Sequence, residues 1–192
     1  MSRSLPVVLA VAIIVWRAGP VSGKSCVGVV FPEETSVQTG PLMLNGVGLR
    51  ERALFRIGVY VAALYVAQQS ADANAILAAN TPKQLVLHFV RDVHSTDLKE
   101  AWEEGFEHNA KAQLPALKER IAQLQAWMVD MQSGQQLTFT QTPGAGIEVD
   151  VNGTVQGTIA GDDFATAFLA IWLGPKPPNP PLKTGLLGGA CD

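Results

Sequence analysis

The spacing of apolar residues changes period twice along this 192-residue chain, and that change limits the folds open to it. Apolar residues recur at helical spacing from Leu98 to Phe106 and again from Leu114 to Met128, which predicts two amphipathic helices. The segments on both sides have the composition and spacing of β-strands. Because single strands and helices do not alternate, a Rossmann-type parallel sheet is excluded. The pattern predicts an α+β domain, with a mostly antiparallel sheet and helices on one face.

In the first half, β-branched and aromatic residues mark the strands. The expected strand segments are 27–31, 42–44, 49–66 (one or two strands around Gly58) and 84–93. The Asn-Gly-Val-Gly segment 45–48 is expected to be a loose connection. A short helix is expected to end at Leu77, with Ser70 or Asp72 as its N-cap.

In the second half, residues of alternating polarity predict a run of short strands. The expected strands are 137–142, 147–151 and 154–159. Asn152-Gly153 suits a type I′ turn, so the last two strands should form a hairpin. Asp162 or Asp163 should then cap a helix that ends at Gly174, just as Ser95 or Thr96 should cap the first long helix. From about Pro175 the chain is a Pro- and Gly-rich tail, with little to bury except three leucines, Leu182, Leu186 and Leu187.

The N-terminal segment 1–23 has the form of a secretory signal peptide. Arg3 precedes an apolar run from Leu5 to Trp16, and small residues follow at 21–23. The alternative, an uncleaved membrane anchor, is weakened because the run is much shorter than the roughly 20 residues that span a bilayer. We therefore expect an exported protein, periplasmic or secreted, whose single domain covers residues 24–192 and keeps no membrane span after cleavage.

The chain has two cysteines, Cys26 and Cys191. A pair is too small a set for a disulfide-stapled miniprotein or a cysteine-based zinc site. In an exported protein the two could form a disulfide that joins the ends of the domain. Two free thiols on mobile tails are the equal alternative.

Charge and motifs exclude several functions. The net charge is −3 and no cluster of basic residues follows a phosphate backbone, so we expect no nucleic-acid partner. The spacing of His88, His94 and His108 fits no metal-ligand pattern, and we expect no metal. No nucleotide- or cofactor-binding motif occurs, and we expect no cofactor. Glu103 and Glu104 belong to the solvated face of a helix.

Two segments together resemble the chalcone isomerase family. Residues 46–50, Gly-Val-Gly-Leu-Arg, and 57–66, Ile-Gly-Val-Tyr-Val-Ala-Ala-Leu-Tyr-Val, are similar to the family's G-x-G-x-R turn and the strand after it. Residues 137–144, Leu-Thr-Phe-Thr-Gln-Thr-Pro-Gly, are similar to its F-T-Q-S-P strand. The order of elements also agrees, so the resemblance covers residues 27 to about 187. It implies an open-faced β-sandwich, a large antiparallel sheet under a layer of helices, with a ligand cleft between them.

The family includes plant enzymes that cyclise chalcones, fatty-acid-binding relatives and bacterial members. Arg50 matches the arginine that stabilises the phenoxide in the enzymes. This chain departs from them elsewhere: Tyr60 replaces a Thr, Ala165 replaces a Ser or Thr, although Thr166 is adjacent, and segment 95–105 lacks their Tyr and Asn. An Arg followed by a strand Tyr is closer to the fatty-acid-binding branch, where such a pair holds a carboxylate.

Together, the signal-peptide pattern and the resemblance lead us to expect an exported, bacterial protein that binds a small amphipathic or carboxylate ligand, fatty-acid-like, through Arg50 and Tyr60 without catalysis. One alternative is an active isomerase of the intramolecular lyase type, with Arg50 as electrophile and Tyr60 or a water completing proton transfer. The other is an interaction or scaffold module that binds no ligand. The sequence leaves the oligomeric state open.

Each candidate residue also has a purely structural interpretation. Arg50, with Arg52 and Arg56 nearby, could be a solvated arginine on a turn. Tyr60 could be a core residue of its strand. Arg91 is a further candidate for the cleft, or else an ion-pair partner of Asp92 or Glu104.

Overall fold

The computed structural model describes residues 23–52 and 57–191. The expected signal peptide lies almost wholly, and Arg56 entirely, outside the described residues. Within the described ranges, none of the helices is both long enough and apolar enough to cross a membrane.

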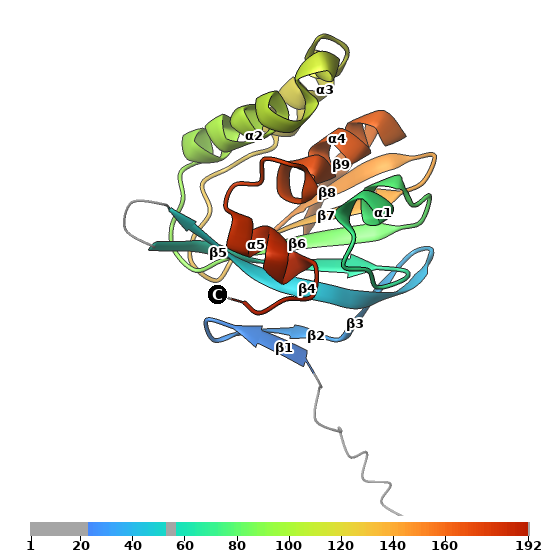
Figure 1. The fold of residues 1–192 in the computed structure, drawn as a ribbon. Helices are drawn as coiled ribbons and strands as arrows, with labels where there is room; N and C mark the ends of the chain where they lie inside the picture. Colours follow the sequence, from blue (N-terminus) through green and yellow to red (C-terminus); the bar gives the residue numbers. More distant parts are fainter. Residues whose placement is uncertain (1–22, 53–56, 192) are drawn as a thin grey trace, which may run out of the picture.

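In the described part of the chain, seven antiparallel strands form one sheet in the order β3-β4-β5-β6-β7-β8-β9 (Figure 1). Each strand pairs with its neighbour in the sequence. The strands are β3 Glu34–Val37, β4 Gly40–Arg52, β5 Ile57–Val66, β6 Lys83–Phe89, β7 Gln136–Thr142, β8 Gly146–Val151 and β9 Thr154–Ala160. A separate two-stranded hairpin comprises β1 Gly23–Cys26 and β2 Val29–Pro32.

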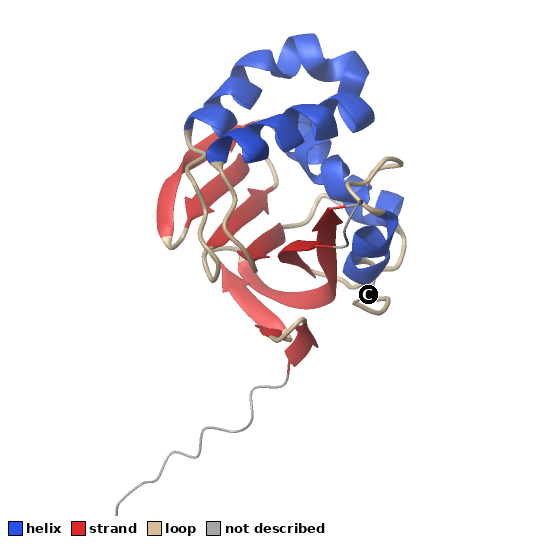
Figure 2. Cartoon of the chain, turned by 90° about the vertical axis from the view of Figure 1, so that its left-hand side faces the viewer, coloured by secondary structure: helices blue, strands red, loops and turns tan. Residues whose placement is uncertain are grey.

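The helices of the described residues lie on one face of this sheet, and the β1–β2 hairpin lies on the other (Figures 1 and 2). They are α1 Ala73–Ala78, α2 Ser95–Ala110, α3 Leu114–Ala126, α4 Asp162–Leu173 and α5 Pro180–Leu186, with a short 3₁₀ turn Lys111–Gln113 between α2 and α3. The predicted α+β class and open-faced β-sandwich are confirmed.

Two cores follow from the period of two along β5. Tyr60, Ala62 and Leu64 point toward the helices, whereas Val61 and Ala63 point toward the hairpin side. All five are buried. The larger core lies between the sheet and the helices, and the cleft described below opens at its edge.

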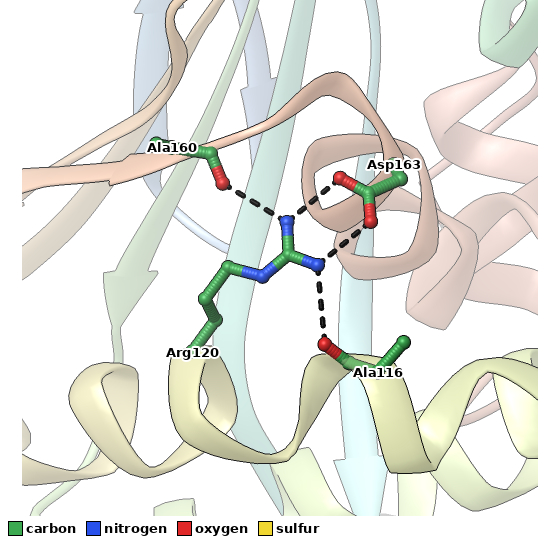
Figure 3. A network of polar contacts seen from close by, with 4 residues as sticks. All are labelled: Ala116, Arg120, Ala160 and Asp163. Carbon is green, nitrogen blue, oxygen red and sulfur yellow. Dashed lines mark hydrogen bonds and ion pairs between the residues drawn. The ribbon is translucent and has the colours of Figure 1, made fainter.

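An arginine fork ties α3 to the start of α4 (Figure 3). Arg120 donates from both terminal nitrogens to the two carboxylate oxygens of Asp163, each at 2.7 Å, and to the backbone oxygens of Ala160 and Ala116. This contact holds the pKa of Asp163 down to about 2. Gly161 lies between the partners with φ +104°, and a Cβ there would meet both side chains.

The prediction of a loose connection at 45–48 was wrong, because these residues lie inside β4. Gly46 and Gly48 are glycines because α5 crosses directly over them. A Cβ on either one would collide with the α5 backbone, at Gly185 and Leu182 respectively. Two glycines in a strand therefore mark close packing of backbones and not a turn.

The tail after Pro175 likewise contains a helix that the sequence did not predict. Helix α5 lies over β4, and its Leu182 and Leu186 are fully buried, as expected of these leucines. Pro180 and Pro181 occupy the first helical turn, where proline is tolerated. Composition alone made this segment look unstructured.

The N-terminal strands also differ from the prediction. The segment 27–31, predicted as one strand, instead contains the turn and most of the second strand of the β1–β2 hairpin. The turn residues Val27 and Gly28 both have positive φ. Strand β3 was not predicted, and β6 ends at Phe89, four residues earlier than expected.

Some local predictions hold. Asp72 caps α1 by accepting hydrogen bonds from two backbone N–H groups, at Asn74 and Ala75. Asn152 and Gly153 both have positive φ, as a type I′ turn requires.

Two predicted N-caps are wrong. Helix α2 is capped at His94, and Asp130 accepts the hydrogen bond from the Ser95 N–H. Helix α4 is capped at Gly161, while Asp162 accepts from the Gly144 N–H.

Candidate functional site

A cleft of about 510 Å³ opens between α2, the paired ends of β4 and β5, and the segment 176–178. Apolar lining comes from Val59, Leu98 and Ile171. Charged lining comes from the sheet side, from α2 and from the C-terminal segment. The basic residues are Arg50, Arg52, Arg91 and Lys176, and the acidic residues are Asp92, Asp97, Glu100 and Glu104.

Arg50 and Tyr60 are directly paired across β4 and β5, so both side chains belong to the same face of the sheet. Arg50 is half-buried and donates from Nη1 to the backbone oxygen of Pro178 at 3.2 Å, and also to that of Glu51. The strand and the C-terminal segment therefore hold the guanidinium at the cleft. Arg50 lies in a strand and not on a solvated turn.

Tyr60 lies deeper, with 5% of its surface exposed. Its hydroxyl oxygen accepts a 2.9 Å hydrogen bond from Trp172 Nε1 on α4. Burial raises the pKa of Tyr60 to about 12, although the Trp172 hydrogen bond and the positive charge of Arg50 act in the opposite direction. Tyr60 is therefore a neutral phenol at pH 7, and it keeps its proton for donation.

Arg91 lines the same cleft, at its exposed rim. The ion pair with Asp92 or Glu104, the alternative interpretation of Arg91, is not formed among the described residues. Asp92 instead accepts a hydrogen bond from the Ser133 N–H at 2.9 Å. The guanidinium of Arg91 thus adds positive charge to the cleft that Arg50 and Arg52 also line.

Two tryptophans of this site were not singled out from the sequence. Trp172 positions Tyr60, as described above. Trp102, only 2% exposed, lines the cleft, and its Nε1 is buried with no hydrogen-bond partner among the described residues. Leaving such a donor unpaired costs about 1–3 kcal/mol. Helical periodicity identified Trp102 only as an apolar position, and no sequence signal marked its N–H.

Each of the three histidines has different neighbours. His88 contacts Gln136, and His94 contacts Asp130, whereas His108 lines the cleft. Within residues 23–52 and 57–191, no group of three or more His, Cys, Asp or Glu side chains is placed to hold a metal ion.

The C-terminal segment that forms one wall of the cleft is tied to the sheet. Cys26 and Cys191 are joined in a disulfide, with Cα atoms 5.8 Å apart. Asn45 donates to the backbone oxygen of Leu186 at 2.7 Å, and Asn179 donates to that of Leu49 at 3.1 Å. These contacts fix α5 and the residues before it on β4.

The chain matches the family model described as chalcone isomerase-like over residues 23–188. It therefore belongs to the chalcone isomerase-like family, as the resemblance of the two sequence segments implied. Among solved structures it is similar to the crystal structure of the fatty-acid binding protein AtFAP1 from Arabidopsis thaliana, with a TM-score of 0.66 and 17% sequence identity. The match covers 83% of this chain and 92% of that protein, and it establishes the shared fold. No curated protein sequence matches the chain.

Proposed function

We propose that this protein binds a small amphipathic carboxylate, fatty-acid-like, in the cleft between α2 and the sheet, and does not convert it. The observation that carries the proposal is the pairing of Arg50 with Tyr60 on one face of the sheet, both lining one cleft. The likeness to a fatty-acid binding protein supports the same ligand class.

The chemistry of the pair suits a carboxylate. A guanidinium presents several donors in a planar fork that matches the two carboxylate oxygens. The neutral Tyr60 hydroxyl adds a donor from the adjacent strand. A hydrogen bond to a charged group contributes about 1.5–3 kcal/mol, and Arg91 adds a further positive charge at the rim.

The apolar part of the ligand has a limited space. Val59, Leu98 and Ile171 offer apolar surface in the cleft. Behind them the core is filled, with Phe89 and Phe168 fully buried. A ligand would therefore lie within the cleft itself and not extend into the core.

Several features argue against turnover. Tyr60 retains its proton up to about pH 12, so it is a poor general base at neutral pH. Ala165, which replaces the Ser or Thr of the plant enzymes, is fully buried and carries no polar group. Without such groups a chalcone would not be held in a reactive orientation, and poor positioning alone removes orders of magnitude in rate.

The same proposal places the protein outside the cytoplasm, periplasmic or secreted, in a bacterial cell. The signal-peptide pattern at 1–23 and the Cys26–Cys191 disulfide support this location. The intact mass of exported protein tests it: a chain that begins near Lys24 agrees, and a retained Met1 contradicts it.

Titration calorimetry with saturated fatty acids of several lengths tests the binding proposal. Arg50→Ala should weaken binding about ten- to a hundredfold. Lys118→Ala, which removes one exposed positive charge on α3, is the control and should leave affinity unchanged. Equal affinity of wild type and Arg50→Ala, or no binding at all, would reject the carboxylate site. Arg50-dependent cyclisation of a chalcone, followed by absorbance, would instead show an isomerase.

A further inference from the structure

The indole N–H of Trp102 is the feature of the cleft that the proposed function does not use. Nearly all buried donors in proteins have a partner, yet Trp102 Nε1 has none among the described residues. Its ring neighbours are Phe139, Phe168 and Trp172, with ring centroids at 6.1, 6.1 and 5.5 Å. These aromatic side chains offer no oxygen to accept the hydrogen bond.

The surroundings of the two indoles differ in a way that points to the cleft. Trp172 uses its N–H to hold Tyr60, while the neighbouring Trp102 keeps its own N–H unused. Trp102 is one of the residues that line the cleft, so a ligand there lies next to its side chain, whose Nε1 is itself buried. Arg50 is the cross-strand neighbour of Tyr60, and Tyr60 is hydrogen-bonded to Trp172. The ring of Trp172 in turn packs against the ring of Trp102.

We propose that Trp102 is a ligand-binding residue whose indole N–H donates to a second oxygen of the bound acid. The ligand class is therefore a carboxylic acid that carries a keto or hydroxyl oxygen on its chain, and not a plain fatty acid. This inference rests on the proposed function, since Arg50 and Tyr60 hold the carboxylate. An indole N–H only donates, so keto and hydroxyl oxygens both satisfy it.

The expected selectivity is modest and measurable. One neutral hydrogen bond should make the oxygenated acid bind about three- to tenfold more tightly than the plain acid of the same length. The position of the oxygen along the chain should matter, because the carboxylate is fixed at Arg50. Acids with the oxygen at the wrong carbon should bind no better than the plain acid.

Calorimetry of octanoic acid against octanoic acids with a hydroxyl or keto group at successive carbons tests this. Wild type should prefer at least one oxygenated acid. Trp102→Phe should bind the oxygenated acids no more tightly than octanoic acid, so that the preference is lost whatever the change in overall affinity. Trp127→Phe is the matched control, because Trp127 packs against Gly157 outside the cleft and should leave the preference intact.

A spectroscopic readout on the wild-type protein does not depend on how the variant folds. With ¹⁵N-labelled indoles, the Trp102 N–H signal should move downfield with the preferred oxygenated acid and not with octanoic acid. Equal binding of all acids with full dependence on Arg50 would overturn the role of Trp102 and leave the proposed function standing. Failure of every acid to bind would overturn the proposed function and this assignment with it.

Discussion

Trp172 Nε1 donates a 2.9 Å hydrogen bond to the hydroxyl oxygen of Tyr60, and so a helix fixes the phenol that lines the cleft. Because the oxygen already accepts from Trp172, its proton remains available to a ligand. Helix α4 therefore contributes to binding through a residue that need not touch the ligand.

This contact predicts how two substitutions compare. Tyr60→Phe should weaken carboxylate binding less than Arg50→Ala does, because it removes one neutral donor and keeps the ring. Trp172→Phe should weaken binding by a similar small factor, since Tyr60 then loses the partner that orients it. Calorimetry of the single and double variants checks the coupling. Strictly additive losses would show that Trp172 and Tyr60 act independently.

Tyrosine ionisation offers a second prediction. The chain has two tyrosines, and burial raises the pKa of both Tyr60 and Tyr65 to about 12. Absorbance near 295 nm should therefore show almost no tyrosinate in the native protein at pH 10.5, whereas a urea-unfolded sample should be more than half ionised.

The same shifts set a direction for stability. A raised folded-state pKa contributes stability that is complete below about pH 10 and is lost as pH rises toward 12. The free energy of unfolding of wild type should therefore fall across this window more than that of Tyr60→Phe or Tyr65→Phe. Native tyrosinate that appears fully at pH 10 would contradict the burial of both hydroxyls.

Substitution of Gly46 by Ala should destabilise the protein by about 1–3 kcal/mol or more, because the added Cβ meets the α5 backbone. Gly58→Ala is the control, since its Cβ would meet only side-chain methyl groups of Leu49 and Val90 at 3.3–3.4 Å. Urea denaturation measures both. A Gly46→Ala protein as stable as Gly58→Ala would show that α5 does not pack on β4.

The Arg120 fork predicts an acid-dependent effect. Arg120→Gln should lower the free energy of unfolding near pH 7 by about 0.5–1 kcal/mol, as expected for a largely exposed pair. The pKa of Asp163 falls from 3.8 to about 2 in the folded protein. Its contribution is therefore present above pH 4 and lost as pH falls toward 2. Denaturation curves across this range should show the difference shrinking, while Lys118→Gln should show none.

The Cys26–Cys191 disulfide should resist alkylation until the protein is reduced. In the chain-entropy model, a loop of this length gives at most about 5 kcal/mol, so Cys26→Ser with Cys191→Ser should lower the melting temperature. The double variant should also bind carboxylates more weakly, because the segment that carries Pro178 loses its anchor. Full labelling of both thiols without reductant would show that they are free.

The fold was predictable wherever the burial of one face of a helix or strand determines which side chains are apolar. The stripe from Leu98 to Phe106 and the alternation around Phe139 fixed the helices and later strands, since burial of one face dictates those patterns. Gly46 and Gly48 misled for a physical reason: a glycine that admits a neighbouring backbone looks in sequence like one that makes a turn. Helix α5 was missed because its stability comes from packing on β4 and not from its own Pro- and Gly-rich composition.

The candidate site was predictable only in part. Arg50 and Tyr60 could be named because a family resemblance marks both, although it assigns Arg50 to a turn and the structure places it in β4, paired with Tyr60. The partners of those residues come from distant segments, Pro178 from the C-terminal wall and Trp172 from α4. Hydrogen bonds across more than a hundred residues leave no local pattern. The unpaired N–H of Trp102 is also invisible in a sequence, because an absent partner is a property of the packed structure.

The disulfide between Cys26 and Cys191 makes the described fold covalently circular. The strand that holds Cys26 lies beside the end of the chain that follows α5 (Figure 1), and the two Cα atoms are close enough for a short peptide linker to replace the bridge. The order in which the segments are synthesised is then separable from the order in which they pack. A circular permutant with new ends at the exposed Asn152-Gly153 turn would keep every strand pairing of the seven-stranded sheet. It would lose only the turn that joins β8 to β9.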